Sequence, residues 1–172
     1  MPCQIERALP EDAADLARLH AQALPHGWDI RDFEASCADE QRLVLKASDG
    51  VCLLGLLVLQ HAAGEGEILT LAVSDQVRRQ GVATMLLKLA IEACHNEGIE
   101  ALYLEVGEHN GPALGLYESA GFKTITRREN YYQLARSAPE TALIMKLDTK
   151  LALTQMYQAR GRLESGGEHG RI

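Results

Sequence analysis

Glu105 is a carboxylate inside an otherwise apolar segment of the chain. It lies in LYLEV, residues 102–106, just before an Asn-Gly-Pro break and a short helix-like segment. The alternation of a strand would place the apolar residues on one face and Tyr103 and Glu105 on the other. A carboxylate in a central strand must find a partner, reach solvent or keep its proton. Carboxylates also act as general bases, although a solvated carboxylate at a strand end is the plainer interpretation.

A second segment has the residues of an anion-binding turn. In LTLAVSDQVRRQGVATMLL, residues 69–87, a polar turn joins a strand pattern to a helix pattern. A helix N-terminus exposes unpaired N–H groups and the positive end of its dipole, which suits a phosphate or pyrophosphate. Gly81 would let the backbone come close to such a group. The turn lacks the Gly-Lys-Ser/Thr ending of nucleotide hydrolases and the three glycines of dinucleotide-binding loops. An ordinary strand-to-helix connection is the alternative.

Composition narrows the class of protein. The 172 residues are 47% hydrophobic and carry a net charge of −7, without a basic cluster. We therefore expect one globular domain that does not bind nucleic acid directly. The acidic start and the short apolar runs predict a cytoplasmic protein without a membrane span. Histidine spacing suggests no metal site, and the four cysteines have no paired spacing, so they read as small buried residues of a reducing compartment: Cys3, Cys37, Cys52 and Cys94.

The order of the expected elements is β-α-α-β-β-β-α-β-α-β-β. A hairpin is expected from residues 42–48 and 51–62, because Asp49–Gly50 is a strong turn signal. A helix at Gly81–Glu97 connects strands at 68–74 and 101–106, which should run parallel. This pattern predicts an α/β protein with a mixed, mostly antiparallel sheet. We expect one domain over residues 1–148 and a C-terminal extension over 149–172, in which a short helix is followed by a disordered tail beyond Gly161.

Three segments resemble the GNAT family of N-acetyltransferases. RRQGVA matches the family's Arg-x-x-Gly-x-Gly/Ala signature, with Ala83 where many relatives have glycine. LYLEV, HNGPALGLYESAGF and RRENYY are similar to the ribosomal-protein-alanine N-acetyltransferases within the family, and HGWDIRDF resembles their acceptor-side loop and second helix. The resemblance covers residues 3–147. It implies the GNAT fold: six to seven strands flanked by about four helices, with two strands splayed apart at the active site.

The resemblance also implies a binding site for acetyl-coenzyme A, the acetyl donor. Family contacts fall on the strand backbone at Leu71, Ala72 and Val73, on the turn, and on Asn110. The turn contributes Arg79, Gln80, Gly81, Val82, Ala83 and Thr84. HNGPALGLY departs from the alanine run that many relatives have at this place, although Pro112 still suits the first turn of a helix.

The same matches imply catalytic and acceptor residues. Glu105 matches the family's general base and Tyr117 its proton donor to the leaving thiolate, and an N–H group around Val73 would stabilise the acetyl oxyanion. A packing role is the alternative for Tyr117. Acceptor-peptide contacts would come from Trp28, Tyr131 and Tyr132, which are otherwise half-buried aromatic residues. Glu108 and His109 could relay protons, and solvated side chains are the alternative.

The resemblance favours acetyl transfer to the α-amino group of a protein N-terminus, such as the N-terminal alanine of a ribosomal protein. The acidic balance fits a basic protein or peptide as partner, with the enzyme a monomer or weak dimer. Acetylation of a small amine or a lysine side chain is the alternative within enzymes, since one fold serves many acceptors. A non-catalytic coenzyme A-binding module is a third possibility, against which the presence of both Glu105 and Tyr117 argues.

Overall fold

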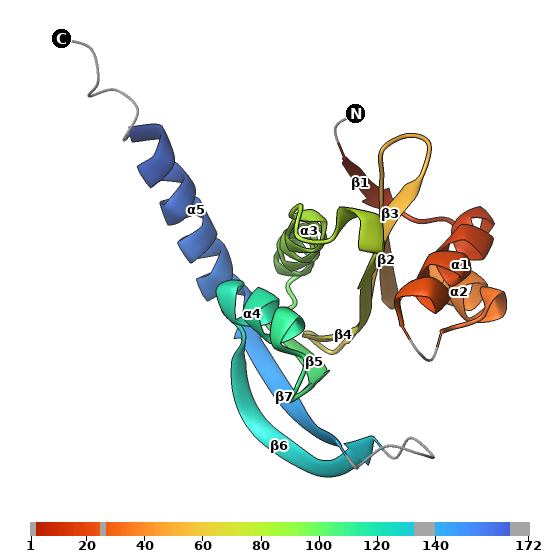
Figure 1. Cartoon of the computed structure of the whole chain (residues 1–172). Helices are drawn as coiled ribbons and strands as arrows, with labels where there is room; N and C mark the ends of the chain where they lie inside the picture. The colour runs from red at the N-terminus through yellow and green to blue at the C-terminus, as the bar shows by residue number, and fades with distance from the viewer. Residues whose placement is uncertain (1–2, 25–26, 133–139, 166–172) are drawn as a thin grey trace.

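A single seven-stranded sheet organises the chain, with helices on both faces. The computed structural model describes residues 3–24, 27–132 and 140–165. The strand order is β1-β2-β3-β4-β5-β7-β6. In Figure 1, α1 and α2 lie on one side of the sheet and α3 on the other, while β6 and β7 form a curved ribbon and α5 projects from the body. The predicted α/β class, with a mixed and mostly antiparallel sheet, is confirmed.

The strands are β1 (Gln4–Arg7), β2 (Arg42–Ser48), β3 (Leu53–Ala62), β4 (Glu65–Val73), β5 (Ala101–Gly107), β6 (Lys123–Tyr132) and β7 (Glu140–Asp148). The helices are α1 (Ala13–Ala23), α2 (Ile30–Ala38), α3 (Val82–Asn96), α4 (Gly111–Ser119) and α5 (Thr149–Ser165), with short 3-10 turns at Pro10–Asp12 and Asp75–Val77. Every predicted element therefore exists. β4 begins earlier than expected, inside the glycine- and glutamate-rich segment before Ile68.

Two apolar clusters hold the layers together. The larger one packs α3 and the start of α5 against the sheet, and the smaller one packs α1 and α2 against the opposite face. Phe33 of α2 is completely buried in the smaller cluster. The entry to α2 is set by a capping box, in which Asp29 and Asp32 each accept a hydrogen bond from the other's backbone N–H at 2.9 Å.

The parallel pair formed by β4 and β5 separates part-way along its length. β4 and β5 pair from Glu65–Ala101 to Ile68–Leu104. β4 carries one additional residue, Leu69, between its pairings to β3 at Ile68 and Thr70. A bulge of this kind bends and twists a strand locally, so β4 leaves β5 at Leu69. The splayed pair that the sequence predicts is confirmed, and the bulge explains where it opens.

α5 is longer than the short helix expected from the sequence. Ala152 and Leu153 are buried against α3, so the start of the C-terminal extension forms part of the core. The helix continues through Gly161 to Ser165, which corrects the expected end of helical structure at Gly161. The predicted disorder of residues 166–172 lies outside the described residues.

Candidate active site

Glu105 is the first β5 residue beyond the last pair with β4, so it lies where the two strands part. Leu104 and Val106 are buried in the core beneath α3, whereas the Glu105 side chain points to the other face and is 21% exposed. A hollow of about 310 Å³ adjoins it, lined also by Glu67, Tyr103 and Ile144. A carboxylate in a central strand needs solvent or a charged partner, and Glu105 has both.

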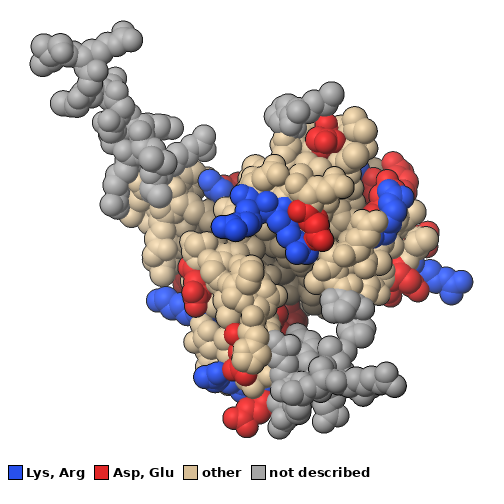
Figure 2. All heavy atoms as spheres, in the orientation of Figure 1, with Lys and Arg blue, Asp and Glu red and all other residues tan. Residues whose placement is uncertain are grey.

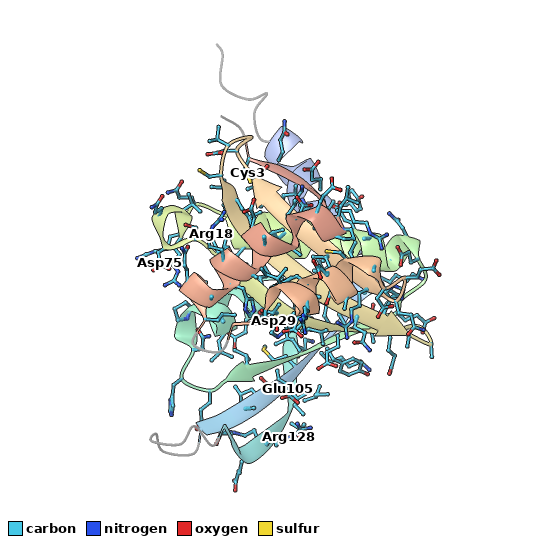
Figure 3. All side chains as sticks on the ribbon, turned by 90° about the vertical axis from the view of Figure 1, so that its right-hand side faces the viewer. Cys3, Arg18, Asp29, Asp75, Glu105 and Arg128 are labelled. Atoms are coloured by element: carbon cyan, nitrogen blue, oxygen red, sulfur yellow. The ribbon has the colours of Figure 1, made fainter. Side chains whose placement is uncertain are left out.

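That partner is Arg128 of β6. Its Nη1 lies 2.8 Å from Oε1 of Glu105, and both side chains are partly exposed. Figure 3 shows the two residues in neighbouring parts of the curved sheet, below α1 and α2. β7 lies between β5 and β6 in the sheet, so the ion pair spans the intervening strand. The pair holds the carboxylate at the opening between β4 and β5.

The edge of β4 presents backbone groups to the same opening. Ser74 donates its N–H to Leu54 of β3 at 2.8 Å. N–H groups in an antiparallel pair alternate between the two sides of the strand, so those of Val73 and Leu71 point away from β3. β5 pairs with no β4 residue beyond Ile68 in the described register. The free edge can therefore receive an extended, amide-containing ligand, and the Val73 N–H can serve a developing oxyanion.

The turn before α3 has the backbone of an anion-binding concavity. Arg79 and Gly81 both adopt left-handed conformations, with φ of 62° and 85°. The first α3 hydrogen bond runs from Met85 N to Gly81 O, and no side chain caps the helix. The N–H groups of Val82, Ala83 and Thr84 are thus left for a ligand.

Gly81 leaves room for that ligand, since a Cβ built there would meet nothing within 4 Å. Figure 2 shows Lys and Arg side chains over the start of α3. They lie beside a hollow between the part of the molecule formed by α4, β6 and β7 and the part formed by β1 to β4 with α1 and α2. These features fit a pyrophosphate, and the free β4 edge fits the amide-bearing arm of coenzyme A.

A sequence model of the acetyltransferase (GNAT) family matches residues 13–122. The chain belongs to the GNAT acetyltransferase family. The ribosomal protein bS18-alanine N-acetyltransferase of Salmonella typhimurium is 34% identical over 74% of this chain and 83% of its own.

Solved structures give the same result. The crystal structure of the ribosomal-protein-S18-alanine N-acetyltransferase from Escherichia coli superposes with a TM-score of 0.80 at 27% identity, covering 86% of this chain and 94% of that one. An Arabidopsis thaliana protein, NAA60, crystallised with acetyl-CoA, shares the fold with a TM-score of 0.76 at 18% identity, covering 86% and 98%.

Tyr117, the second catalytic candidate of this GNAT chain, is largely buried on α4. Its ring is 8% exposed and packs edge-on against Phe122, with the ring centroids 5.7 Å apart. Burial raises the pKa of the hydroxyl to about 12. The packing role expected as the alternative is therefore real, and the hydroxyl keeps its proton at neutral pH.

Asn110 has a structural role that the sequence did not predict, whereas Trp28 has the half-buried packing position that was expected as its alternative. Oδ1 of Asn110 caps α4 by accepting from Ala113 N at 3.3 Å, which leaves its amide nitrogen and one lone pair of Oδ1 for a cofactor. The Trp28 ring packs against His20 and Phe33, with centroids 5.8 and 5.5 Å away. Tyr131 and Tyr132 end β6, and their side chains lie outside the described part of the structure.

Several further candidates can be placed. Glu108 pairs with Arg127 at 2.6 Å, and His109 is exposed beside it, so both resemble solvated side chains more than a relay to Glu105. The described residues contain no group of histidine, cysteine and acidic side chains arranged to hold a metal ion. No helix among them is long and apolar enough to cross a membrane.

Two residues of the site were missed from the sequence, Arg128 and His20. Arg128 belongs to the RRENYY segment, residues 127–132, but only the order of the strands in the sheet shows that its side chain reaches β5. His20 carried a usable signal: it falls at helical spacing with Leu16 and Ala23 on the apolar face of its helix. A histidine at such a position predicts a buried, hydrogen-bonded ring.

Proposed function

We propose that this chain transfers the acetyl group of acetyl-coenzyme A to the α-amino group of a protein N-terminus. The observation that carries the proposal is the position of Glu105, a partly exposed carboxylate at the point where β4 and β5 separate. The names of its relatives support an N-terminal alanine of a ribosomal protein as acceptor. Such an acceptor is found in the cytoplasm, which agrees with the location expected from the sequence.

Glu105 would act as the general base. An α-ammonium group has no free electron pair, so it must lose its proton before or during attack on a carbonyl. The hollow beside Glu105 gives an amine access to the carboxylate. Arg128 engages Oε1 and so limits the rotation of the group that takes the proton. Bound acetyl-coenzyme A would supply the electrophilic thioester and a stable thiolate leaving group.

Tyr117 would donate a hydrogen bond to the leaving sulfur rather than transfer its proton completely. Its pKa of about 12 exceeds the value of about 8.5 for a thiol in water, so complete transfer of the proton is unfavourable. A neutral hydroxyl can still stabilise developing negative charge through a hydrogen bond. Val73 would act similarly on the acetyl oxygen through its outward N–H group.

The α3 turn would bind the pyrophosphate through the N–H groups of Val82, Ala83 and Thr84, with Leu71 and Val73 pairing along the rest of the cofactor. This arrangement places the donor over the α3 side of the sheet. Glu105 and its hollow lie on the α1–α2 side. The acceptor would therefore enter from the side of α1, α2 and the end of β6, opposite the donor.

One experiment separates the possible acceptors. The full chain is incubated with acetyl-coenzyme A and, in parallel, with peptides that have a free N-terminal alanine, the same peptides with a blocked N-terminus and an internal lysine, and small polyamines. Thiol release is followed over time. We expect turnover with free N-terminal alanine and none after blocking. Turnover on lysine or polyamines alone would assign another acceptor, and binding without turnover on any amine would indicate a non-catalytic module.

A further inference from the structure

His20 links three elements on the acceptor side of the sheet. It lies on α1 and is 2% exposed. Its Nδ1 is 3.0 Å from the backbone nitrogen of Trp28, and its Nε2 is 2.9 Å from Oγ1 of Thr70 on β4. The ring also packs edge-on against Phe33, with centroids 5.5 Å apart. One buried side chain therefore joins α1, the segment that enters α2, and β4.

The two hydrogen bonds determine the protonation state of the ring. A backbone N–H can only donate, so Nδ1 accepts and carries no proton. Nε2 then carries the proton of the neutral ring and donates to Thr70. Burial lowers the pKa of His20, which favours this neutral form at pH 7.

The position of Thr70 connects this network to the active site. Thr70 directly follows the bulged Leu69, on the part of β4 that has left β5. Trp28 directly precedes Asp29, the residue that caps α2. In Figure 1, α1 and α2 lie on the side of the sheet opposite α3. Glu105 points to that side, because its neighbours Leu104 and Val106 pack in the cluster beneath α3. Fixing Trp28 to Thr70 thus fixes the entrance of α2 relative to the splayed strand.

Stability alone does not account for a histidine here. Its neighbours form an apolar cluster that includes Leu16, Leu19 and Phe33. Burying an imidazole among them incurs a desolvation penalty that two hydrogen bonds only offset. An apolar ring of similar size would pack in the same space but could not define where the Trp28 backbone lies. The geometry favours a role in positioning.

We infer that His20 is a positioning residue for the acceptor: it holds the Trp28 segment against β4 and so shapes the wall along which the substrate N-terminus binds. This inference rests on the proposed function, because it assigns the α1–α2 side to the acceptor. His20 does not contact the reacting atoms. Loss of the His20 side chain should therefore weaken acceptor binding. The acetyl-coenzyme A site, on the α3 side of the sheet, should be unchanged.

Three substitutions separate the two hydrogen bonds. His20→Asn keeps an acceptor near the position of Nδ1, His20→Gln keeps a donor near that of Nε2, and His20→Phe keeps only the ring. Because one hydrogen bond contributes about 0.5–1.5 kcal/mol, we expect His20→Phe and His20→Gln to raise the peptide KM by about three- to tenfold. His20→Asn keeps the bond to the Trp28 N–H and loses only the bond to Thr70, so it should raise the peptide KM less than His20→Phe does. The KM for acetyl-coenzyme A should not change.

Thr149→Val is the matched control for lost stability. Thr149 is 1% exposed and donates to Ile99 O at 2.7 Å, in a region packed by α5. This variant should unfold more easily yet keep the wild-type peptide KM. A peptide KM that does not rise in His20→Gln, or that rises equally in Thr149→Val, would overturn the inference. Thr70→Val tests the second bond without altering the histidine.

A second readout does not depend on turnover. Trp28 is the one tryptophan in the sequence, so its fluorescence reports this contact alone. Acrylamide should quench Trp28 more readily in His20→Gln than in wild type or His20→Asn. Equal quenching in all three would refute the positioning role even if peptides are acetylated. Failure of the wild-type chain to acetylate any N-terminus would instead refute the proposed function, so the two failures can be told apart.

Discussion

The guanidinium of Arg128 lies 2.8 Å from the carboxylate of Glu105, across the intervening strand β7. The contact joins a candidate base on β5 to the edge strand β6. It keeps the carboxylate beside the opening between β4 and β5, where an incoming amine would meet the donor.

Glu105→Gln should lower kcat/KM for the acceptor peptide by about 10²–10⁴-fold, the usual contribution of a positioned general base. The loss should shrink above about pH 8, where a free α-amino group is already neutral. Glu108→Gln is the control, because Glu108 pairs with Arg127 and lies just past the same strand. A Glu105→Gln enzyme with nearly wild-type rate at neutral pH would show that another group, or solvent, takes the proton.

Arg128→Met should lower peptide kcat/KM by about tenfold, the low end of the about 1.5–3 kcal/mol that a hydrogen bond between charged groups contributes, because both side chains are partly exposed. If Arg128 acts by orienting Glu105, the same change made in Glu105→Gln should have little further effect. Steady-state kinetics of the four proteins measures this coupling. Equal losses in both backgrounds would mean that Arg128 acts independently of the base. Arg127→Met serves as the control for removing a neighbouring positive charge.

Gly81→Ala should weaken acetyl-coenzyme A binding by at least about tenfold, measured by calorimetry, because a methyl group would occupy the space where the backbone meets an anion. Gly98→Ala is a matched control at the other end of α3. Both glycines have positive φ, 85° and 75°, and neither Cβ would meet another atom within 4 Å. Each substitution should destabilise the fold by about 1–2 kcal/mol. Wild-type affinity in Gly81→Ala would exclude this turn as the pyrophosphate site.

Deleting residues 161–172 should leave turnover unchanged, since the α5 residues that are described as buried, Thr149, Ala152 and Leu153, lie at its start. Leu153→Ala should instead lower the free energy of unfolding by about 2–3 kcal/mol, because Leu153 is 7% exposed in the main core. Urea denaturation and peptide kinetics on both proteins test the end of α5 and its buried start separately. A large loss of turnover after deletion would assign the C-terminal segment a part in catalysis or assembly.

Acidification should destabilise the protein through His20. Burial lowers its pKa in the folded state, whereas the unfolded chain titrates near pKa 6.5. As the pH falls below about 6.5, the unfolded state takes up a proton that the folded state refuses, so stability decreases. Between pH 6.5 and 5.5 the free energy of unfolding of wild type should fall, relative to that of His20→Phe, by up to about 1 kcal/mol. A difference that is independent of pH would contradict this reasoning.

The sequence by itself determined the elements and most of the candidate site. Helical and strand periodicity, the Asp49–Gly50 turn and the glycines after helices act through neighbouring residues, so a short window of sequence contains them. The same holds for Glu105, whose place on the polar face of β5 follows from alternation alone. The position of the turn before α3 could also be predicted from the sequence, although the left-handed backbone of Arg79 could not.

Tertiary structure decided how these parts meet. The bulge at Leu69 is defined by how β4 pairs with β3, and the pairing of β4 with β5 ends just before it. The contacts Glu105–Arg128 and His20–Thr70 join residues 23 and 50 positions apart. The burial that raises the pKa of Tyr117 and the docking of Leu153 likewise come from packing between distant segments. Such contacts depend on sheet order and chain crossing, and local periodicity contains no information about either.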